Sequence, residues 1–268
     1  MSHPDHMPPP LEETEGRTSR GIQSVEVGGQ LLKALAHTGR ALALKDLARE
    51  ADMTPAKAHP YLVSFGKLGL IEQDPVSGHY GLGPLAMQLG LISLQQVDPV
   101  RLATAELPAL AQRVGCTVSA AVWGGEGPVI IRVEEGPTPV YVAMRHGTPA
   151  SLRHTGTGKI FSAFAPRHDV ERALAHQGLA GALEDPAFAA ELEAIRRSGM
   201  TRVHEELLPG VSAMAVPVFD GFGRLVLAIA AIGPTARLNL QEGSEQVSAL
   251  REMGRNLSRR LGATSNCT

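Results

Sequence analysis

A glycine-rich stretch, Thr155-Gly156-Thr157-Gly158-Lys159, has residue types that could bind a phosphate or another anion. It does not match the Walker phosphate-binding pattern, which needs Gly where Arg153 stands and Ser or Thr where Ile160 stands. What remains is a glycine-rich entry to a helix, whose free amides can accept a carboxylate. The alternative is that the glycines serve only a tight turn.

Residues that could carry out catalysis are not spaced as enzymes need them. Ser212 lies in Gly210-Val211-Ser212-Ala213-Met214, which lacks the second glycine of a nucleophile elbow. The two cysteines, Cys116 and Cys267, lie far apart without paired-ligand spacing, so the sequence predicts neither a disulfide framework nor a zinc site. We therefore expect a protein that is not an enzyme and has no cofactor.

A second set of polar residues follows Thr54-Pro55, a strong helix start with Thr54 as N-cap and Pro55 as the first helical residue. Lys57 is placed to reach a base edge or a phosphate, because recognition helices use their first turns in the major groove. Solvation alone would also explain Lys57, and capping alone would explain Thr54. The residues expected to contact DNA from this helix are Thr54, Ala56, Lys57, His59, Tyr61 and Ser64.

The elements around this helix predict a winged helix-turn-helix. A first helix is expected from the N-cap Ser24 to His37, where Gly39 stops it, and a short helix follows at residues 45–51. The expected recognition helix runs to about Leu68, with its apolar positions Ala58, Leu62, Phe65 and Leu68 facing the core and Gly69 closing it. The turn-rich residues 74–78 are predicted to form the tip of a β-hairpin wing, from which Ser77 and His79 could contact DNA.

The rest of the chain predicts an α+β domain with an antiparallel sheet covered by helices. Residues 84–96 form an apolar helix, and Asp98-Pro99 starts another helix toward Val114. Strands are expected at 117–123, 128–134, 140–144, 200–204, 212–219 and 225–232, and helices near 158–165, 169–177, 186–198 and 241–261.

Bulk composition is compatible with two ordinary domains. The 268 residues include 25 Lys+Arg and 27 Asp+Glu, a formal charge of −2, so global charge does not predict nucleic-acid binding. Locally, residues 17–70 carry eight basic and four acidic side chains, which suits a small set of phosphate contacts. No run of about eighteen apolar residues occurs, so we expect no membrane span and a cytoplasmic protein.

Several separate motifs in the right order resemble the IclR family of bacterial transcriptional regulators. The motifs are Gln23-Ser24-Val25-Glu26, Leu47-Ala48-Arg49-Glu50-Ala51, Gly69-Leu70-Ile71-Glu72, Tyr80-Gly81-Leu82-Gly83, Thr155-Gly156-Thr157-Gly158-Lys159, Glu205-Glu206-Leu207-Leu208-Pro209-Gly210-Val211-Ser212-Ala213, Ala215-Val216-Pro217-Val218-Phe219-Asp220 and Gly233-Pro234. Residues 1–19, rich in Pro, Glu, Ser and Thr, are predicted to form a disordered tail. The resemblance implies a winged helix-turn-helix at 20–83, a linker helix at 84–97 and a GAF-like effector-binding domain at 98–262. It also implies assembly as a homodimer or homotetramer.

The resemblance further implies an effector pocket rimmed by the glycine-rich loop. The residues assigned to it are Trp123, Met144, Gly156, Thr157, Gly158, Glu205, Ala213, Ala230 and Ile232. Relatives can show Cys or Ser where Ala213, Ala230 and Ile232 stand, so an apolar wall here suggests an aromatic or partly apolar acid held by the loop amides. Trp123 and Met144 could instead be plain core residues.

One position departs from the family pattern, because Pro60 stands where similar members usually carry Arg. Proline inside a helix removes a backbone hydrogen bond and costs roughly 3 kcal/mol, so the recognition helix is expected to bend or to begin a turn later.

Taken together, the motifs and the resemblance predict a DNA-binding regulator, most often a repressor, that binds a palindromic operator and responds to a small organic acid. The alternative is a small-molecule-binding protein with weakened DNA binding that acts through protein partners.

Overall fold

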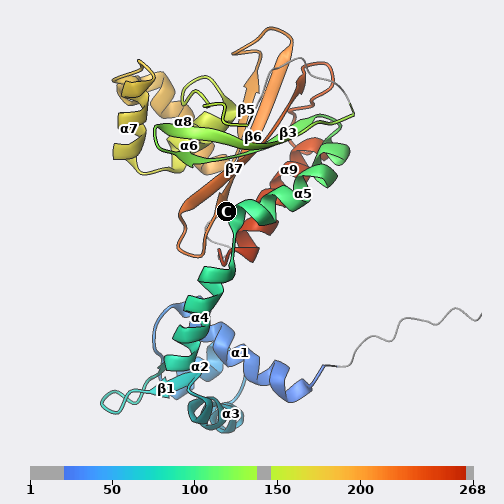
Figure 1. The fold of residues 1–268 in the computed structure, drawn as a ribbon. Helices are drawn as coiled ribbons and strands as arrows, with labels where there is room; N and C mark the ends of the chain where they lie inside the picture. The colour runs from blue at the N-terminus through green and yellow to red at the C-terminus, as the bar shows by residue number, and fades with distance from the viewer. Residues whose placement is uncertain (1–20, 138–145, 264–268) are drawn as a thin grey trace, which may run out of the picture. The chain divides into compact units, whose positions relative to one another are not determined.

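The structure is a computed structural model in which residues 21–137 and 146–263 are described. The chain divides into two compact units, residues 1–94 and 95–268 (Figure 1). The predicted tail at 1–19, the predicted strand at 140–144 and Met144 lie outside the described residues.

The N-terminal unit is a winged helix-turn-helix, as the sequence predicts. Its helices are α1 (Gln23–Thr38), α2 (Leu44–Glu50) and α3 (Pro55–Leu68), followed by the antiparallel strands β1 (Ile71–Gln73) and β2 (Tyr80–Leu82) and by helix α4 (Pro84–Gln96). Leu31, Leu47, Ala58, Leu62 and Ile71 are buried together and form the core of this unit. Burying these apolar side chains holds three short helices around one small core.

Two local predictions in this unit are wrong, and one of the two alternatives expected from Pro60 does not occur. Helix α1 begins at Gln23 after Ile22, with no side-chain cap, so Ser24 is not its N-cap. Leu68 is 61% exposed rather than buried. Helix α3 begins at Pro55 despite Pro60, so it does not start a turn later. The predicted stops are confirmed, because Gly39 and Gly69 end α1 and α3 with φ of 68° and 74°, a conformation that suits glycine.

The C-terminal unit is built on a five-stranded antiparallel sheet in the order β4-β3-β7-β6-β5. The strands are β3 (Thr117–Gly124), β4 (Gly127–Glu134), β5 (Thr201–His204), β6 (Val211–Phe219) and β7 (Leu225–Pro234). The helices are α5 (Pro99–Val114), α6 (Gly156–Phe164), α7 (Arg167–His176), α8 (Pro186–Ser198) and α9 (Glu245–Arg260), with a short 3-10 turn, η1 (Ala182–Glu184), that the sequence did not predict.

Helices cover both faces of this sheet. Helices α5 and α9 pack on one face, and α6 with α7 and α8 packs on the other (Figure 1). Because successive strand residues point to opposite faces, Met214 and Ile229 join the core under α5 and α9, whereas Ala215 and Ala230 join the core under α6.

Helix starts in this unit depend on local caps. Asp98 caps α5 through its carboxylate, next to Pro99, at the helix start that the sequence predicts. Asp185 caps α8 in the same way, next to Pro186, which the sequence analysis did not predict. Helix α9 begins at Glu245 with Ser244 as N-cap, four residues later than predicted. Among the described helices, none has the length and apolar character needed to cross a bilayer.

Candidate functional site

The first candidate site is the amino-terminal turn of α3. The Thr54 hydroxyl accepts a hydrogen bond from the Lys57 amide at 3.3 Å, so Thr54 is the N-cap that the sequence predicts. This bond fixes the start of the helix and leaves the Lys57 side chain exposed. The free amides at such a helix start and the positive charge of an exposed lysine can both bind a phosphate.

The side chains predicted to contact DNA do not all share one environment. Ala56, Lys57, His59 and Ser64 are exposed, whereas Ala58 and Leu62 are buried against the core. Ser64 donates through its hydroxyl to the Pro60 carbonyl at 3.0 Å. Tyr61 differs, because its half-buried ring packs near Gly28 of α1, where an added Cβ atom would lie 2.8 Å from Tyr61 Cδ1. Four of the predicted side chains are therefore exposed on α3, whereas Tyr61 packs toward α1.

Two basic residues near α3 were missed by the sequence reasoning. Lys45 and Arg49 of α2 line a hollow of about 570 Å³ together with Thr54 and Pro55 at the start of α3. Arg49 also forms an ion pair with Asp46 at 2.8 Å. The local surplus of basic residues was the available signal, but sequence spacing does not show which of them lie beside the α3 amino terminus.

The wing ends in a turn that is organised by one carboxylate. Asp74 Oδ1 accepts hydrogen bonds from the Ser77 amide at 2.6 Å, the Ser77 hydroxyl at 2.9 Å and the Val76 amide at 3.0 Å. These bonds, those from Ser77 foremost, hold the pKa of Asp74 below its usual range. The Ser77 hydroxyl is thus engaged within the wing, and His79 is half-buried at its base.

The second candidate site is the amino terminus of α6. Thr155 is its N-cap and accepts the Gly158 amide at 3.0 Å, while its own hydroxyl donates to the Ser151 carbonyl at 2.7 Å. Within the described part of the chain, no acceptor is bonded to the amides of Gly156 and Thr157. Two amides at a helix amino terminus form a favourable position for a carboxylate.

Close packing requires glycine at Gly158. A Cβ atom added there would lie 1.9 Å from the Ser151 carbonyl oxygen, which is far inside contact distance. This glycine therefore serves the close approach of two backbones, in line with the plain turn interpretation. That role leaves the Gly156 and Thr157 amides free to serve a ligand.

The α6 amino terminus lies directly over the sheet at β5 and β6. The Thr201 hydroxyl donates to the Gly156 carbonyl at 3.2 Å, and a Cβ atom at Gly156 would lie 3.7 Å from Ala215 Cβ. Ala215 pairs with Ala230 across the sheet. The structure thus places Gly156 against Ala215, the strand neighbour of Ala230, on the α6 face of the sheet.

Two more predicted pocket residues lie on the same face, one row further along. Ala213 pairs with Ile232, and both are half-buried. Residues two apart on a strand share a face, so Ala213 stands beside Ala215, and Ile232 stands beside Ala230. Ala213, Ala230 and Ile232, which we call the apolar patch, therefore share the face of the sheet on which α6 packs, and their role as a pocket wall stays a prediction.

Glu205 is not brought to this patch. It adopts a φ of 56°, and the Thr235 hydroxyl and the Gly210 amide donate hydrogen bonds that lower the pKa of its carboxyl group. Thr235 also shares a hydrogen bond of 2.9 Å with Ser212. Ser212 points to the opposite face of β6 from Ala213.

Trp123 also lies away from the patch. Its ring packs against Phe161 of α6, with centroids 5.8 Å apart, in the core beneath that helix. Ser119 is the β3 residue that pairs with Ala230, and Trp123 is four positions further along that strand. At about 3.4 Å per residue, Trp123 lies roughly 14 Å along β3 from Ser119, the partner of Ala230.

Lys159 is a structural residue that the sequence reasoning missed. Its side chain is 3% exposed, and its Nζ lies 2.6 Å from both Glu191 of α8 and Glu206 of the loop after β5. A buried ammonium needs such partners. The bridge ties the glycine-rich turn of α6 to two other segments.

The sequence matches two family models. Residues 24–75 match the IclR helix-turn-helix domain, and residues 92–259 match the bacterial transcriptional regulator IclR C-terminal domain. The two matched ranges contain both candidate sites. Residues 76–91, which include β2 and the first part of α4, lie between the two matched ranges.

Curated and solved proteins agree with these matches. The chain is 31% identical to the glycerol operon regulatory protein of Streptomyces griseus, over 91% of this chain and 98% of that one. It is 29% identical to the HTH-type transcriptional regulator BhcR of Paracoccus denitrificans, over 90% and 88%. The crystal structure of Pseudomonas aeruginosa HmgR superposes with a TM-score of 0.80 at 35% identity, covering 91% and 100%.

Proposed function

Because the chain belongs to the IclR family of bacterial transcriptional regulators, with a DNA-binding domain and an effector-binding C-terminal domain, we propose that it represses transcription from a palindromic operator until a small organic acid binds. The family is one of regulators and not of enzymes. Under this proposal the protein acts in the cytoplasm, where its DNA target lies.

The observation that carries the DNA part of the proposal is the exposed side of α3. Ala56, Lys57, His59 and Ser64 are exposed on the helix that follows the turn, while Ala58 and Leu62 hold that helix to the core. Thr54 caps the helix, and Lys45 and Arg49 lie beside its start. In our proposal α3 enters the major groove, the neighbouring basic residues contact phosphates, and Ser77 and His79 of the wing approach the flanking backbone.

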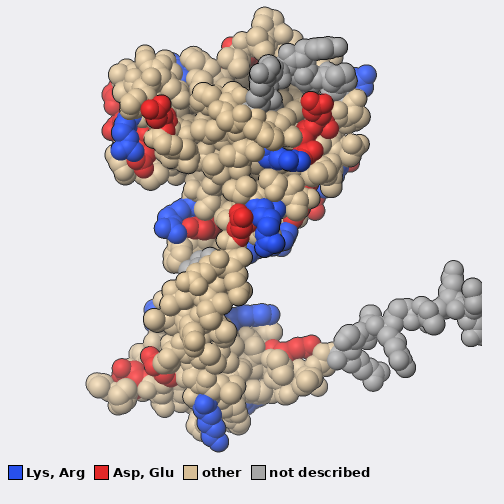
Figure 2. Space-filling model, viewed as in Figure 1, with Lys and Arg blue, Asp and Glu red and all other residues tan. Residues whose placement is uncertain are grey.

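Self-association is supported by the exposed apolar side chains of α4. Met87, Leu89, Leu91 and Ile92 are 70%, 52%, 53% and 42% exposed. Figure 2 shows an uncharged surface over this helix, whose sequence has no Asp, Glu, Lys or Arg. An apolar patch of this kind needs a partner, and a second copy would supply the same helix in a symmetric homodimer, or in a homotetramer made of two such dimers. A symmetric pair of α3 helices would read a palindromic operator.

The effector part of the proposal rests on the amides of Gly156 and Thr157. We place the effector carboxylate on these amides and its apolar or aromatic body against Ala213, Ala230 and Ile232. The effector would shift the equilibrium between DNA-competent and DNA-incompetent states by binding one of them more tightly.

A direct test measures the release of a labelled fragment of the protein's own promoter region by fluorescence anisotropy. Short-chain and aromatic acids would first be screened by thermal shift, because a ligand that binds only the folded state raises the melting temperature. We expect an acid that raises the melting temperature also to release the DNA. Acids that stabilise the protein without changing DNA affinity in either direction would contradict the regulatory part of the proposal.

Pro60 favours a second candidate function. It is the sixth residue of α3 and has no amide hydrogen to donate to the Ala56 carbonyl. If this weakens DNA binding, the protein would act as a small-molecule-binding protein through protein partners. Pro60→Arg distinguishes the two functions, since undetectable promoter binding by the wild type together with strong binding by the variant would favour the second.

A further inference from the structure

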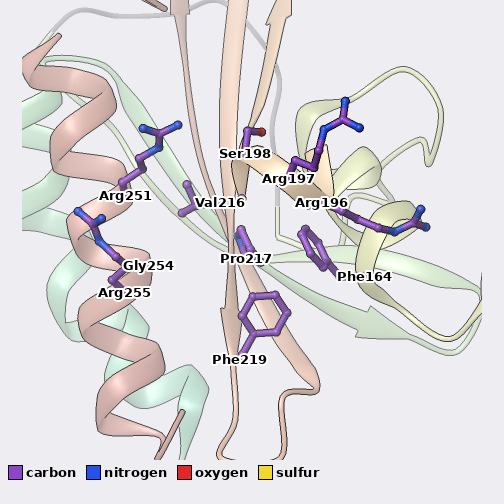
Figure 3. Close-up of a pocket in the computed structure, with 11 residues that line it drawn as sticks. Phe164, Arg196, Arg197, Ser198, Val216, Pro217, Phe219, Arg251, Gly254 and Arg255 are labelled. Carbon is purple, nitrogen blue, oxygen red and sulfur yellow. The ribbon is translucent and has the colours of Figure 1, made fainter. Parts of the chain in front are cut away.

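An arginine-rich hollow lies at the edge of the C-terminal sheet, away from the proposed effector site. Its volume is about 620 Å³. The floor is formed by Val216, Pro217 and Phe219 of β6 with Phe164 at the end of α6. Figure 3 shows Arg196 and Arg197 to one side of these residues and Arg251 and Arg255 on α9 to the other, with the ends of Arg196, Arg197 and Arg255 directed away from β6. The lining residues are Phe164, Arg196, Arg197, Ser198, Gly199, Val216, Pro217, Phe219, Arg251, Gly254 and Arg255; we call this hollow the arginine groove.

The groove exists because β5 is shorter than β6. Strand β5 begins at Thr201, which pairs with Ala215, so the β6 residues that follow Ala215 have no neighbour on that side. Helix α8 and its Gly199 turn form one wall, and α9 forms the other. Figure 3 shows Arg196 and Arg197 on the first wall and Arg251 and Arg255 on the second.

This strand edge is closed to a further β-strand. Pro217 has no amide hydrogen to donate, and the Phe219 amide already donates to the Ser258 hydroxyl of α9 at 3.0 Å. Proline and occupied amides are devices that protect sheet edges from strand addition. A peptide in extended conformation is therefore excluded as the occupant, and a compact ligand fits the groove better.

The lining of the groove has four positive side chains and no acidic one. Two of the arginines are already held, since Arg196 Nε donates to the Ala163 carbonyl at 2.7 Å and pairs with Glu193, and Arg251 pairs with Glu242. Arg197 and Arg255, one on each wall, have no carboxylate within ion-pair distance in the described parts of the chain. Glu252 pairs with Arg113 at 2.7 Å, and Arg113 foremost, with a smaller contribution from Arg255, lowers the pKa of its carboxyl group.

We propose that the arginine groove binds a small multivalent anion, a compact molecule with two or more carboxylate or phosphate groups. A guanidinium group matches either oxyanion with two parallel hydrogen bonds. Two arginines without a carboxylate partner among the described residues, one on each wall, suit a ligand with at least two anionic groups. A volume of about 620 Å³ lies within the range of roughly 300–1,000 Å³ that is usual for small-molecule sites.

The groove is a second site and not part of the effector pocket. Gly156, at the first residue of α6, belongs to the proposed effector pocket, whereas Phe164, at its last residue, lines the groove. At 1.5 Å per residue these ends are roughly 12 Å apart. This inference does not depend on the proposed operator binding or on the identity of the effector.

Isothermal titration calorimetry on the full chain tests the proposal, with citrate as the carboxylate probe and pyrophosphate as the phosphate probe at constant ionic strength. We expect saturable binding of at least one probe with one site per chain. The double variant Arg197→Gln/Arg255→Gln should weaken it by at least about tenfold, because each lost guanidinium removes charge-assisted hydrogen bonds. Which probe binds identifies the oxyanion class.

The matched control is Arg259→Gln, which removes an exposed arginine of α9 that does not line the groove. Its affinity should stay within about twofold of the wild type, since surface charges outside the site contribute little. The proposal is overturned if neither probe binds saturably, or if the double variant and the control bind alike. Promoter binding is measured on the same samples. A protein that binds no promoter DNA would contradict the proposed regulatory function, whereas only the calorimetry decides whether the arginine groove binds an anion.

Discussion

Nζ of Lys159 lies 2.6 Å from a carboxylate oxygen of Glu206, 47 positions later in the chain, and 2.6 Å from Glu191 of α8. The lysine side chain is 3% exposed, while the two glutamates are 39% and 40% exposed. The bridge therefore joins a buried cation to two carboxylates that water still reaches. It fixes the first turn of α6, where we place the effector carboxylate.

Lys159→Ala is expected to destabilise the C-terminal domain by about 2 kcal/mol. Removing one partner of a buried ion pair costs about 3–5 kcal/mol, and the cost is smaller here because the remaining carboxylates are partly solvated. Urea unfolding followed by the fluorescence of Trp123, the single tryptophan, measures it. Arg167→Ala, which breaks only exposed ion pairs, should change the free energy of unfolding by less than about 1 kcal/mol. Equal effects of the two substitutions would contradict this account of the bridge.

Gly158→Ala is expected to lower the free energy of unfolding by about 3 kcal/mol, because the added methyl group forces apart two backbones that leave no space for it. Gly29→Ala is the control. Gly29 lies within α1, and nothing stands within 4 Å of an added Cβ atom, so alanine should be neutral or stabilising by up to about 1 kcal/mol. Thermal denaturation of both variants measures these changes in stability. A Gly158→Ala protein as stable as the wild type would show that the contact between Gly158 and Ser151 is not tight.

The Asp74 carboxyl group is expected to titrate below the ordinary value of about 3.9 for aspartate. The Ser77 amide and hydroxyl and the Val76 amide favour its charged form. Since its pKa is depressed in the folded state, the stabilisation of the wing is present above the unfolded pKa and is lost as pH falls through the folded pKa. The NMR shift of the Ser77 amide should follow this titration and should stop doing so in Asp74→Asn. A midpoint at or above 3.9 would contradict the hydrogen-bonded turn.

Thr54→Ala should destabilise the N-terminal domain by about 1 kcal/mol, the usual cost of losing a side-chain N-cap. Thr54→Ser keeps a hydroxyl for the Lys57 amide and should retain most of the stability. Circular dichroism during thermal unfolding would compare the two. If serine and alanine behaved alike, the hydrogen bond from Lys57 would not be what stabilises the start of α3.

The parts of the fold that depend on neighbouring residues in the sequence were predictable. Thr54-Pro55 and Asp98-Pro99 start α3 and α5 where predicted, because a cap and a proline act within one turn. Leu68 was predicted to be buried from its spacing, and it is exposed because the core of the small N-terminal unit ends before the last turn of α3. Propensity and spacing cannot show where a core ends.

The candidate sites also consist of parts that the sequence could predict and parts that only the folded structure brings together. Ala213, Ala230 and Ile232 could be grouped from motifs, and strand pairing places them together. The partners of Lys159 could not be predicted, because Glu191 and Glu206 come from segments that only the folded topology brings to it. The arginine groove has the same origin, since Arg197 and Arg255 belong to different helices on the two sides of one strand edge.

The central claim, that α3 binds operator DNA, is tested most directly by the salt dependence of promoter binding for the wild type, Lys57→Ala and the control Lys33→Ala, an exposed lysine of α1. We predict that log affinity falls linearly with log salt concentration and that Lys57→Ala weakens binding and reduces the slope by about 1, as expected for one lost phosphate contact. Lys33→Ala should leave the slope unchanged. A flat salt dependence in the wild type, or Lys57→Ala and Lys33→Ala behaving alike, would contradict the claim.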